Sequence, residues 1–189
     1  YKQECIVVNK KDSCEEDLGV CDVKKTTKTG EQSALLLICD VPDIINEIRK
    51  EHDDHTHIPA HITVGYLTTN YDEEELIQKL QTFNKMTLEL DTLYSVPPKN
   101  NPQLIAFSVK KESIRDIIDS VEDYIDKYPK SGFHMSLAYK RDDTKITQTV
   151  YEEIRENITI PTNVVINEIH IMKRNKQINQ DWYKSNTII

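Results

Sequence analysis

The sequence has no long apolar run: no segment reaches the roughly 18 consecutive apolar residues that a membrane-spanning helix needs. A charged-then-apolar leader is also missing, and we therefore expect a cytoplasmic protein without a membrane span. Pro/Gly-rich and low-complexity runs are absent, which favours one compact globular unit across the 189 residues. Because the first residue is Tyr1 and not methionine, we expect this unit to be part of a larger protein.

The chain also lacks an excess of basic residues. Its 24 Lys and Arg against 32 Asp and Glu give a formal net charge of −8 at pH 7. This balance excludes a broad basic surface for long nucleic acid, and it still permits a small or end-bound anionic substrate.

Cysteine is confined to the first part of the chain, and no two cysteines have the Cys-x-x-Cys spacing of a zinc ribbon. In a chain of this size without a signal segment, we expect reduced structural thiols rather than disulfides. The four cysteines are Cys5, Cys14, Cys21 and Cys39.

What the sequence does contain is one pattern in two copies, HITVGY beginning at His61 and HMSLAY beginning at His134. Each copy runs histidine, apolar, hydroxyl, apolar, small, tyrosine. Alternate side chains of a strand share a face, so His61 is expected beside Thr63 and His134 beside Ser136. The chain thus offers two matched pairs of histidine and hydroxyl, which suit acid–base cleavage of a phosphodiester.

The same parity predicts the position of the tyrosine in each copy. Tyr66 and Tyr139 are expected on the opposite face of their strands, with Ile62 and Met135, unless a bulge changes the parity. We therefore expect both tyrosines to be packing residues.

Apolar periodicity predicts a helix, a histidine strand and a second helix around each copy of the pattern. The order of elements indicates an α+β fold built as a duplicated unit, with residues 1–32 as an N-terminal extension or added hairpin before a domain at 33–189. Strands are predicted at 34–39, 60–67, 86–90, 104–109, 133–140 and 164–172, with the third and fourth as a hairpin. Helices are predicted from residue 42 and at 72–83, 113–129 and 144–157, the third with capping-box character at 113–116.

The paired His-x-Thr-x and His-x-Ser-x motifs, each between two predicted helices, resemble those of the 2H phosphoesterase superfamily. The resemblance spans about residues 33–172. That superfamily includes 2′,3′-cyclic nucleotide phosphodiesterases, RNA 2′,3′-cyclic phosphodiesterases and 2′,5′-phosphodiesterases that degrade oligoadenylates. It implies a bilobal fold with a pseudo-twofold axis, in which antiparallel sheets form a central cleft and the helices lie outside.

The resemblance implies that His61 and His134 are catalytic and that Thr63 and Ser136 bind the substrate phosphate. Histidine titrates near neutrality, so a neutral imidazole can accept a proton while a protonated one donates a proton to the leaving oxygen. The hydroxyls can donate hydrogen bonds to the non-bridging phosphate oxygens. We expect a metal-independent phosphodiesterase with no cofactor, acting on a nucleotide, oligonucleotide or RNA end. A 2′,3′-cyclic phosphate and a 2′,5′-linked oligoadenylate are both open as substrates, as is the choice of acid and base.

Two other functions stay open. A non-catalytic module that binds nucleotides or RNA ends would keep the same cleft. The dense run from His52 to His61 could instead hold a divalent metal for a phosphohydrolase, although we expect this run to be a polar loop leading into the histidine strand. His170, on the last predicted strand, is interpreted as structural.

Substrate contacts outside the motifs are less sharply predicted. Phe107 and Phe133 are candidates for stacking on a base, with core packing as the alternative for each. Lys140 is a candidate phosphate contact, with ordinary solvated charge as the alternative.

Overall fold

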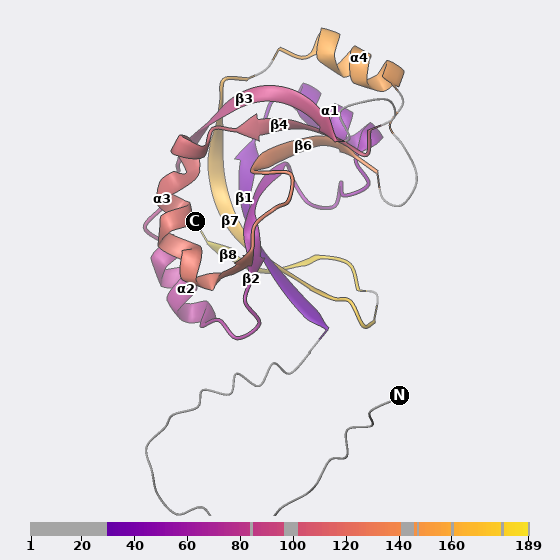
Figure 1. The fold of residues 1–189 in the computed structure, drawn as a ribbon. Helices are drawn as coiled ribbons and strands as arrows, with labels where there is room; N and C mark the ends of the chain where they lie inside the picture. The colour runs from indigo at the N-terminus through magenta and orange to yellow at the C-terminus, as the bar shows by residue number, and fades with distance from the viewer. Residues whose placement is uncertain are drawn as a thin grey trace, which may run out of the picture.

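A computed structural model describes residues 30–83, 85–96, 102–140, 146, 148–159, 161–178 and 180–188. The predicted extension up to residue 29, with three of the four cysteines, lies outside the described residues, as does most of the predicted loop at 97–102. The described chain forms four α-helices and a mostly antiparallel sheet (Figure 1). In these ranges no helix is both long and apolar enough to span a bilayer.

Most of the predicted elements are confirmed. The strands are β1 Glu31–Asp40, β2 His61–Leu67, β3 Thr87–Val96, β4 Leu104–Val109, β5 Ile125–Lys127, β6 His134–Tyr139, β7 Asn163–Asn175 and β8 Tyr183–Ile188. The helices are α1 Asp43–His52, α2 Glu73–Leu80, α3 Lys111–Val121 and α4 Gln148–Asn157, with a 3₁₀ turn, η1, at Glu122–Tyr124.

The sheet is strongly curved. Its strand order is β1-β2-β6-β4-β3-β7-β8, and β7 also pairs with β1, so the sheet returns to its first strand. The two histidine strands, β2 and β6, are neighbours that meet at a single pair, Ile62 with Met135. Beyond this pair they have no further register contact, which leaves room between the two motifs. The mixed, mainly antiparallel architecture agrees with the prediction, and the two-lobed duplication stays a prediction.

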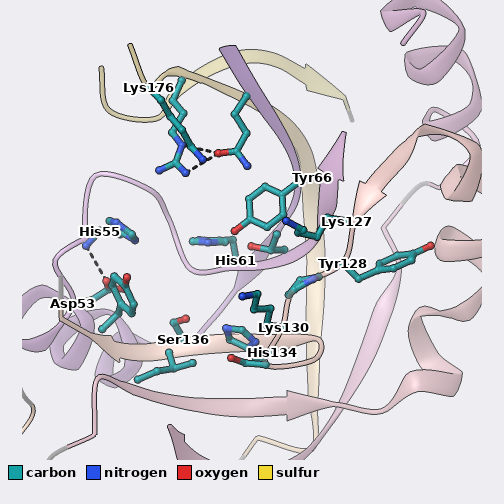
Figure 2. A pocket seen from close by; sticks show the side chains of 17 residues that line it. Asp53, His55, His61, Tyr66, Lys127, Tyr128, Lys130, His134, Ser136 and Lys176 are labelled. Carbon is teal, nitrogen blue, oxygen red and sulfur yellow. Dashed lines mark hydrogen bonds between the residues drawn. The ribbon is translucent and has the colours of Figure 1, made fainter. Parts of the chain in front are cut away.

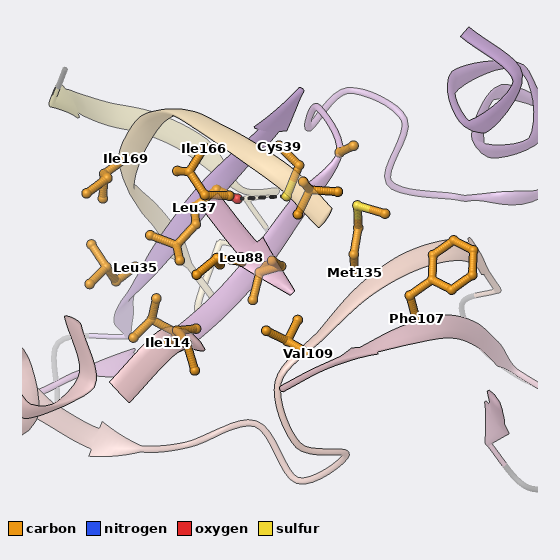
Figure 3. Packing of buried hydrophobic residues seen from close by; sticks show 14 of the residues in the cluster. Leu35, Leu37, Cys39, Leu88, Phe107, Val109, Ile114, Met135, Ile166 and Ile169 are labelled. Atoms are coloured by element: carbon orange, nitrogen blue, oxygen red, sulfur yellow. Dashed lines mark hydrogen bonds between the residues drawn. The ribbon is translucent and has the colours of Figure 1, made fainter. Parts of the chain in front are cut away.

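Strand β1 is buried on both faces, which explains its nearly continuous apolar sequence. On one face Leu35, Leu37 and Cys39 join the main core (Figure 3). On the other face Leu36 belongs to a smaller apolar cluster that lies beside the candidate site described below. The members of this smaller cluster are Ala34, Leu36, Ile38, Ile58 and Met172, with Tyr66 and Trp182 packed against them.

The predicted helix at 113–129 is too long. Helix α3 ends at Val121, and after η1 the chain becomes strand β5, which pairs with β2. Ile125 continues the helical spacing of the apolar residues, yet it packs as a strand residue. Ser113 is also not the N-cap: it lies inside α3, and its hydroxyl donates to the Lys110 carbonyl and accepts from the Glu89 N–H.

Candidate active site

A cavity of about 460 Å³ brings the two motifs together (Figure 2). His61 and Thr63 reach it from β2, and His134 and Ser136 reach it from β6. The intervening apolar residues of each strand, such as Ile62 and Met135, are fully buried, as the strand alternation predicts. All four residues predicted from the motifs therefore line one site.

Both imidazoles are held by the same local hydrogen bond. His61 Nδ1 lies 2.8 Å from the carbonyl oxygen of Pro59, and His134 Nδ1 lies 2.8 Å from that of Gly132. A carbonyl oxygen only accepts, so these bonds assign the proton of each neutral ring to Nδ1. In both rings Nε2 is then the nitrogen that can exchange a proton with a bound molecule.

The cavity walls change the acidity of both histidines. Burial lowers the pKa of His61 to about 4; the nearby Arg49 lowers it too, while the Pro59 carbonyl acts in the opposite direction. Burial also lowers the pKa of His134, against the effect of the Gly132 carbonyl. Both rings are thus neutral at pH 7 in the free protein. A bound phosphate would favour the charged imidazolium and so raise these pKa values.

Strands β2 and β6 each carry a β-bulge at the same place in the motif. Along β1, the partners of consecutive residues jump from Gly65 to Thr63, and along β4 they jump from Ala138 to Ser136. Each strand therefore holds one extra residue immediately after its hydroxyl residue, which reverses the parity that follows.

The bulges correct one expectation from the sequence. Tyr66 and Tyr139 do not lie on the face opposite the histidines, because the extra residue returns them to the cavity wall. Tyr139 stacks on the His55 ring with centroids 4.9 Å apart, and Tyr66 lies against Trp182 at 6.3 Å. The two tyrosines are therefore site residues that the assumption of a regular strand misplaced.

Gly65 occupies the small position of the first motif for a steric reason. A Cβ atom at this position would lie 2.8 Å from two side-chain atoms of Ile125 and 3.3 Å from the Lys127 carbonyl oxygen. The bare backbone allows β5 to lie directly beside β2. That contact brings Lys127, and Lys130 after it, to the edge of the cavity.

Cations gather at this cavity although the chain as a whole is acidic. Lys127 lines it from β5, opposite Tyr66, and Lys130 and Lys176 also line it (Figure 2). Arg174, near the end of β7, is the fourth cation of the lining. Arg174 is fixed in place, since its Nε and Nη2 atoms donate to Gln32 Oε1 over 2.9 and 2.6 Å. A site with four cations and two neutral histidines suits a phosphate-bearing ligand. The basic run at 173–176 and the Lys-Tyr-Pro-Lys segment at 127–130 were the sequence signals for these cations.

The predicted contacts outside the motifs do not line the cavity. Phe107 is fully buried in the main core, so the prediction that it stacks on a base is wrong. Phe133 packs against the same core and edge-on to Tyr128. Lys140 pairs with Asp54 over 2.9 Å. Neither Phe133 nor Lys140 is among the residues that line the cavity.

The side chains of the run from His52 to His61 form ion pairs, hydrogen bonds and ring contacts. His52 ends α1, and Asp53 is 5 % exposed and accepts from Arg49 Nη2 over 2.8 Å. Arg49 also donates to the Ile58 carbonyl. Within the described ranges no group of three His, Cys, Asp or Glu is arranged to hold a metal ion. His57 lies 3.9 Å from an Asp181 carboxylate oxygen and edge-on to the His55 ring, with the ring centroids 6.0 Å apart.

This run instead connects α1 to the second histidine strand. Asp53 forms a parallel bridge with Tyr139, and the Asp54 N–H donates to the Tyr139 carbonyl oxygen over 2.8 Å. The expected polar loop thus has a buried ion pair at its base. His170 is buried beside Glu168 on β7 and does not line the cavity, as a structural residue would be placed.

Comparison with known proteins identifies the family. The 2'-5' RNA ligase superfamily matches residues 39–178, a segment that holds both motifs and most of the cavity wall. The chain therefore belongs to this superfamily, the 2H phosphoesterases that the paired motifs predicted. No curated protein matches the chain.

Two solved structures are similar to the chain. One is Usb1 of Kluyveromyces marxianus, at 10% identity over 81% of this chain and 96% of that one, with a TM-score of 0.40. The other is the same protein with uridine monophosphate, at 11% identity over 82% of this chain and 97% of that one, with a TM-score of 0.38.

Proposed function

We propose that this protein is a metal-independent phosphodiesterase that cleaves an RNA-derived bond to a 2′-oxygen by acid–base catalysis with His61 and His134. The observation that carries the proposal is the matched anchoring of the two imidazoles. Each ring has Nδ1 bound to a backbone carbonyl, and each lines the same cation-rich cavity. One neutral ring and one protonated ring at such a cavity are the two groups that hydrolysis of a phosphodiester needs.

The environments of the two rings suggest which is the base. Burial, and to a smaller extent the Arg49 cation, lowers the pKa of His61 to about 4, so His61 stays neutral down to an acidic pH. His61 Nε2 takes a proton from water while the water oxygen bonds to phosphorus. The bond from phosphorus to the leaving oxygen breaks, and that oxygen receives the Nε2 proton of His134. A 2′,3′-cyclic phosphate and a 2′,5′-linked bond need the same two proton transfers.

The remaining cavity residues stabilise charge. Thr63 and Ser136 stand two residues after their histidines, where their hydroxyls can donate to the non-bridging oxygens as negative charge develops. Arg174 is held ready by Gln32, which lowers the entropic cost of binding a phosphate oxygen. The name of the superfamily, which refers to a 2'-5' RNA bond, agrees with a substrate that contains a 2′-oxygen.

The test is an assay of the protein in excess chelator with two substrates, a 2′,3′-cyclic-phosphate-terminated oligonucleotide and a 2′,5′-linked oligoadenylate. We expect cleavage of at least one of them at a rate that added zinc or manganese does not change. Activity that disappears in chelator and returns with either metal would support the phosphohydrolase built on the run from His52 to His61. Binding of both substrates without turnover would support the non-catalytic module.

A further inference from the structure

A small side pocket opens beside the catalytic cavity, on the His61 side. Its volume is about 100 Å³. It shares His55, His61, Thr63 and Tyr66 with the main cavity, so a ligand at His61 can extend into it without leaving the site. The other residues that line it are apolar or aromatic: Ala34, Leu36, Ile58, Met172 and Trp182.

Aromatic rings form one wall of this pocket. The rings of Tyr66 and Trp182 lie 6.3 Å apart at an interplanar angle of 30°. The Arg174 guanidinium lies over the Trp182 ring, 4.4 Å from its centroid, and Gln32 fixes its position. The indole therefore has a tyrosine ring and a guanidinium as neighbours. Flat apolar groups with a π-face gain most from such a wall, because they can stack on it.

In the part of the chain that the structure describes, this pocket lies on the His61 side of the site. Its lining includes His61 and Thr63 but neither His134 nor Ser136. A substrate with one planar apolar group and several negative charges would therefore bind in one direction.

We infer that the side pocket receives the nucleobase attached to the scissile phosphate on the His61 side; this inference rests on the phosphodiesterase activity proposed above. The occupant is a base because it must be planar, largely apolar and joined to a phosphate that reaches the two histidines. The five lining residues outside the main cavity offer only the Trp182 indole N–H as a polar side-chain group for the edge of a base. Binding by stacking is therefore expected to be nearly equal for adenine, uracil and the other bases.

Tryptophan fluorescence tests the inference directly, because Trp182 is the single tryptophan of the sequence. The ligands are adenosine 2′-phosphate, uridine 2′-phosphate and an abasic ribose phosphate. We expect both nucleotides to change the emission saturably and at similar concentrations, and the abasic phosphate to leave it unchanged. An equal response to the abasic phosphate, or no response to any of the three, would overturn the inference.

Substitution of Trp182 supplies a second measurement. In Trp182→Leu we expect KM for a nucleotide substrate to rise about tenfold with kcat nearly unchanged, since stacking is lost while the proton transfers are retained. KM for the matching substrate that lacks the base on this side should not change. Trp182→Phe should recover most of the affinity. The matched control is Tyr183→Leu, which changes a neighbouring, 43 % exposed side chain on β8 and should leave both KM values unchanged.

The outcomes separate this inference from the proposed function. If no substrate is cleaved, the proposed activity fails, while the fluorescence titration still shows whether a base enters the pocket. If His61→Ala and His134→Ala abolish turnover but Trp182→Leu alters both KM values equally, the activity stands and the base pocket is refuted.

Discussion

On each side of the site the histidine Nδ1 bonds to a backbone carbonyl, but the residues that supply the two carbonyls differ in conformational freedom. On one side the accepting carbonyl belongs to Pro59, whose ring fixes φ. On the other side it belongs to Gly132, which has a φ of +75° that side-chain-bearing residues rarely adopt. The same carbonyl position is thus supplied by a conformationally rigid residue on one side and by a conformationally free residue on the other.

The surroundings of the rings differ as well. His61 lies near the buried Arg49–Asp53 ion pair and opens to the apolar side pocket. His134 contacts the Tyr94 ring edge-on and is not among the residues that line that pocket. Two nearly identical motifs are therefore expected to take different roles, with His61 as the base and His134 as the acid.

Removal of either imidazole should have the largest effect. His61→Ala and His134→Ala should each lower kcat by at least about a hundredfold, because each removes a proton carrier. The double variant should lose little more than either single one, since the two groups act as a unit. Single-turnover kinetics measure the loss, and circular dichroism checks the fold.

The neighbouring hydroxyls provide the comparison for these variants. Thr63→Ala and Ser136→Ala should each cost about tenfold, because a hydrogen-bond donor is lost and the proton carriers stay. A histidine variant with nearly normal turnover would refute the two-histidine mechanism.

The pH dependence of kcat/KM should reveal the two roles. A base must be neutral, so the rate should fall in acid as His61 becomes protonated near its pKa of about 4. An acid must be protonated, and burial lowers the pKa of His134, so the rate should fall as pH rises through a value below the ordinary 6.5. The optimum should lie on the acid side of neutrality, with a loss of about tenfold per pH unit above it.

Variants assign each limb of this profile. Residual activity of His61→Ala should lack the acid limb, and that of His134→Ala should lack the alkaline limb. The reverse assignment would exchange the proposed acid and base. Because bound phosphate raises both pKa values, the profile of kcat should lie at higher pH than that of kcat/KM.

The sequence predicted the elements whose apolar period is uninterrupted. It failed where tertiary contacts determine whether a segment forms a helix or a strand. The buried run of β1 and the β3–β4 hairpin follow from composition and alternation. The end of α3 does not, because Ile125 keeps the helical phase while packing against Gly65 in a strand. Strand β8 was missed since Tyr183–Ile188 is mostly polar and gains its place by pairing with β7.

The candidate site divides in the same way. His61, Thr63, His134 and Ser136 were predictable because each pair lies within one strand. Tyr66 and Tyr139 were misplaced, since one extra residue in each strand reverses the parity and nothing in the local pattern fixes a bulge. Cations such as Arg174 come from distant segments, and only the closure of the sheet brings them to the histidines.

Substitution of Gly132 and Pro59, whose carbonyls accept the histidine hydrogen bonds, tests whether the difference in backbone freedom matters for catalysis. Gly132→Ala should lower kcat about tenfold, because a positive φ costs an L-residue about 1–2 kcal/mol and relaxation would turn the carbonyl away from His134. Gly132→Asn should be milder, since asparagine tolerates this region better. Pro59→Ala keeps a carbonyl at an accessible φ and should change kcat by about twofold or less. Equal losses in Gly132→Ala and Pro59→Ala would show that the backbone difference is irrelevant to catalysis.

The fifth position of each motif, which holds a small residue, gives the test with the smallest expected effect. Gly65→Ala should lower the free energy of unfolding by about 1–3 kcal/mol, since the new methyl would clash with the Ile125 side chain and the Lys127 carbonyl would have to move slightly. Ala138 stands at the equivalent position in β6 and is fully buried, so Ala138→Gly should cost about 0.5–1 kcal/mol. Urea unfolding measures both.

Ile125→Ala in the Gly65→Ala background should recover part of the loss, because the clash is removed. If Gly65→Ala is as stable as the parent protein, then β5 does not require a bare backbone beside it, and the route by which Lys127 reaches the cavity is different.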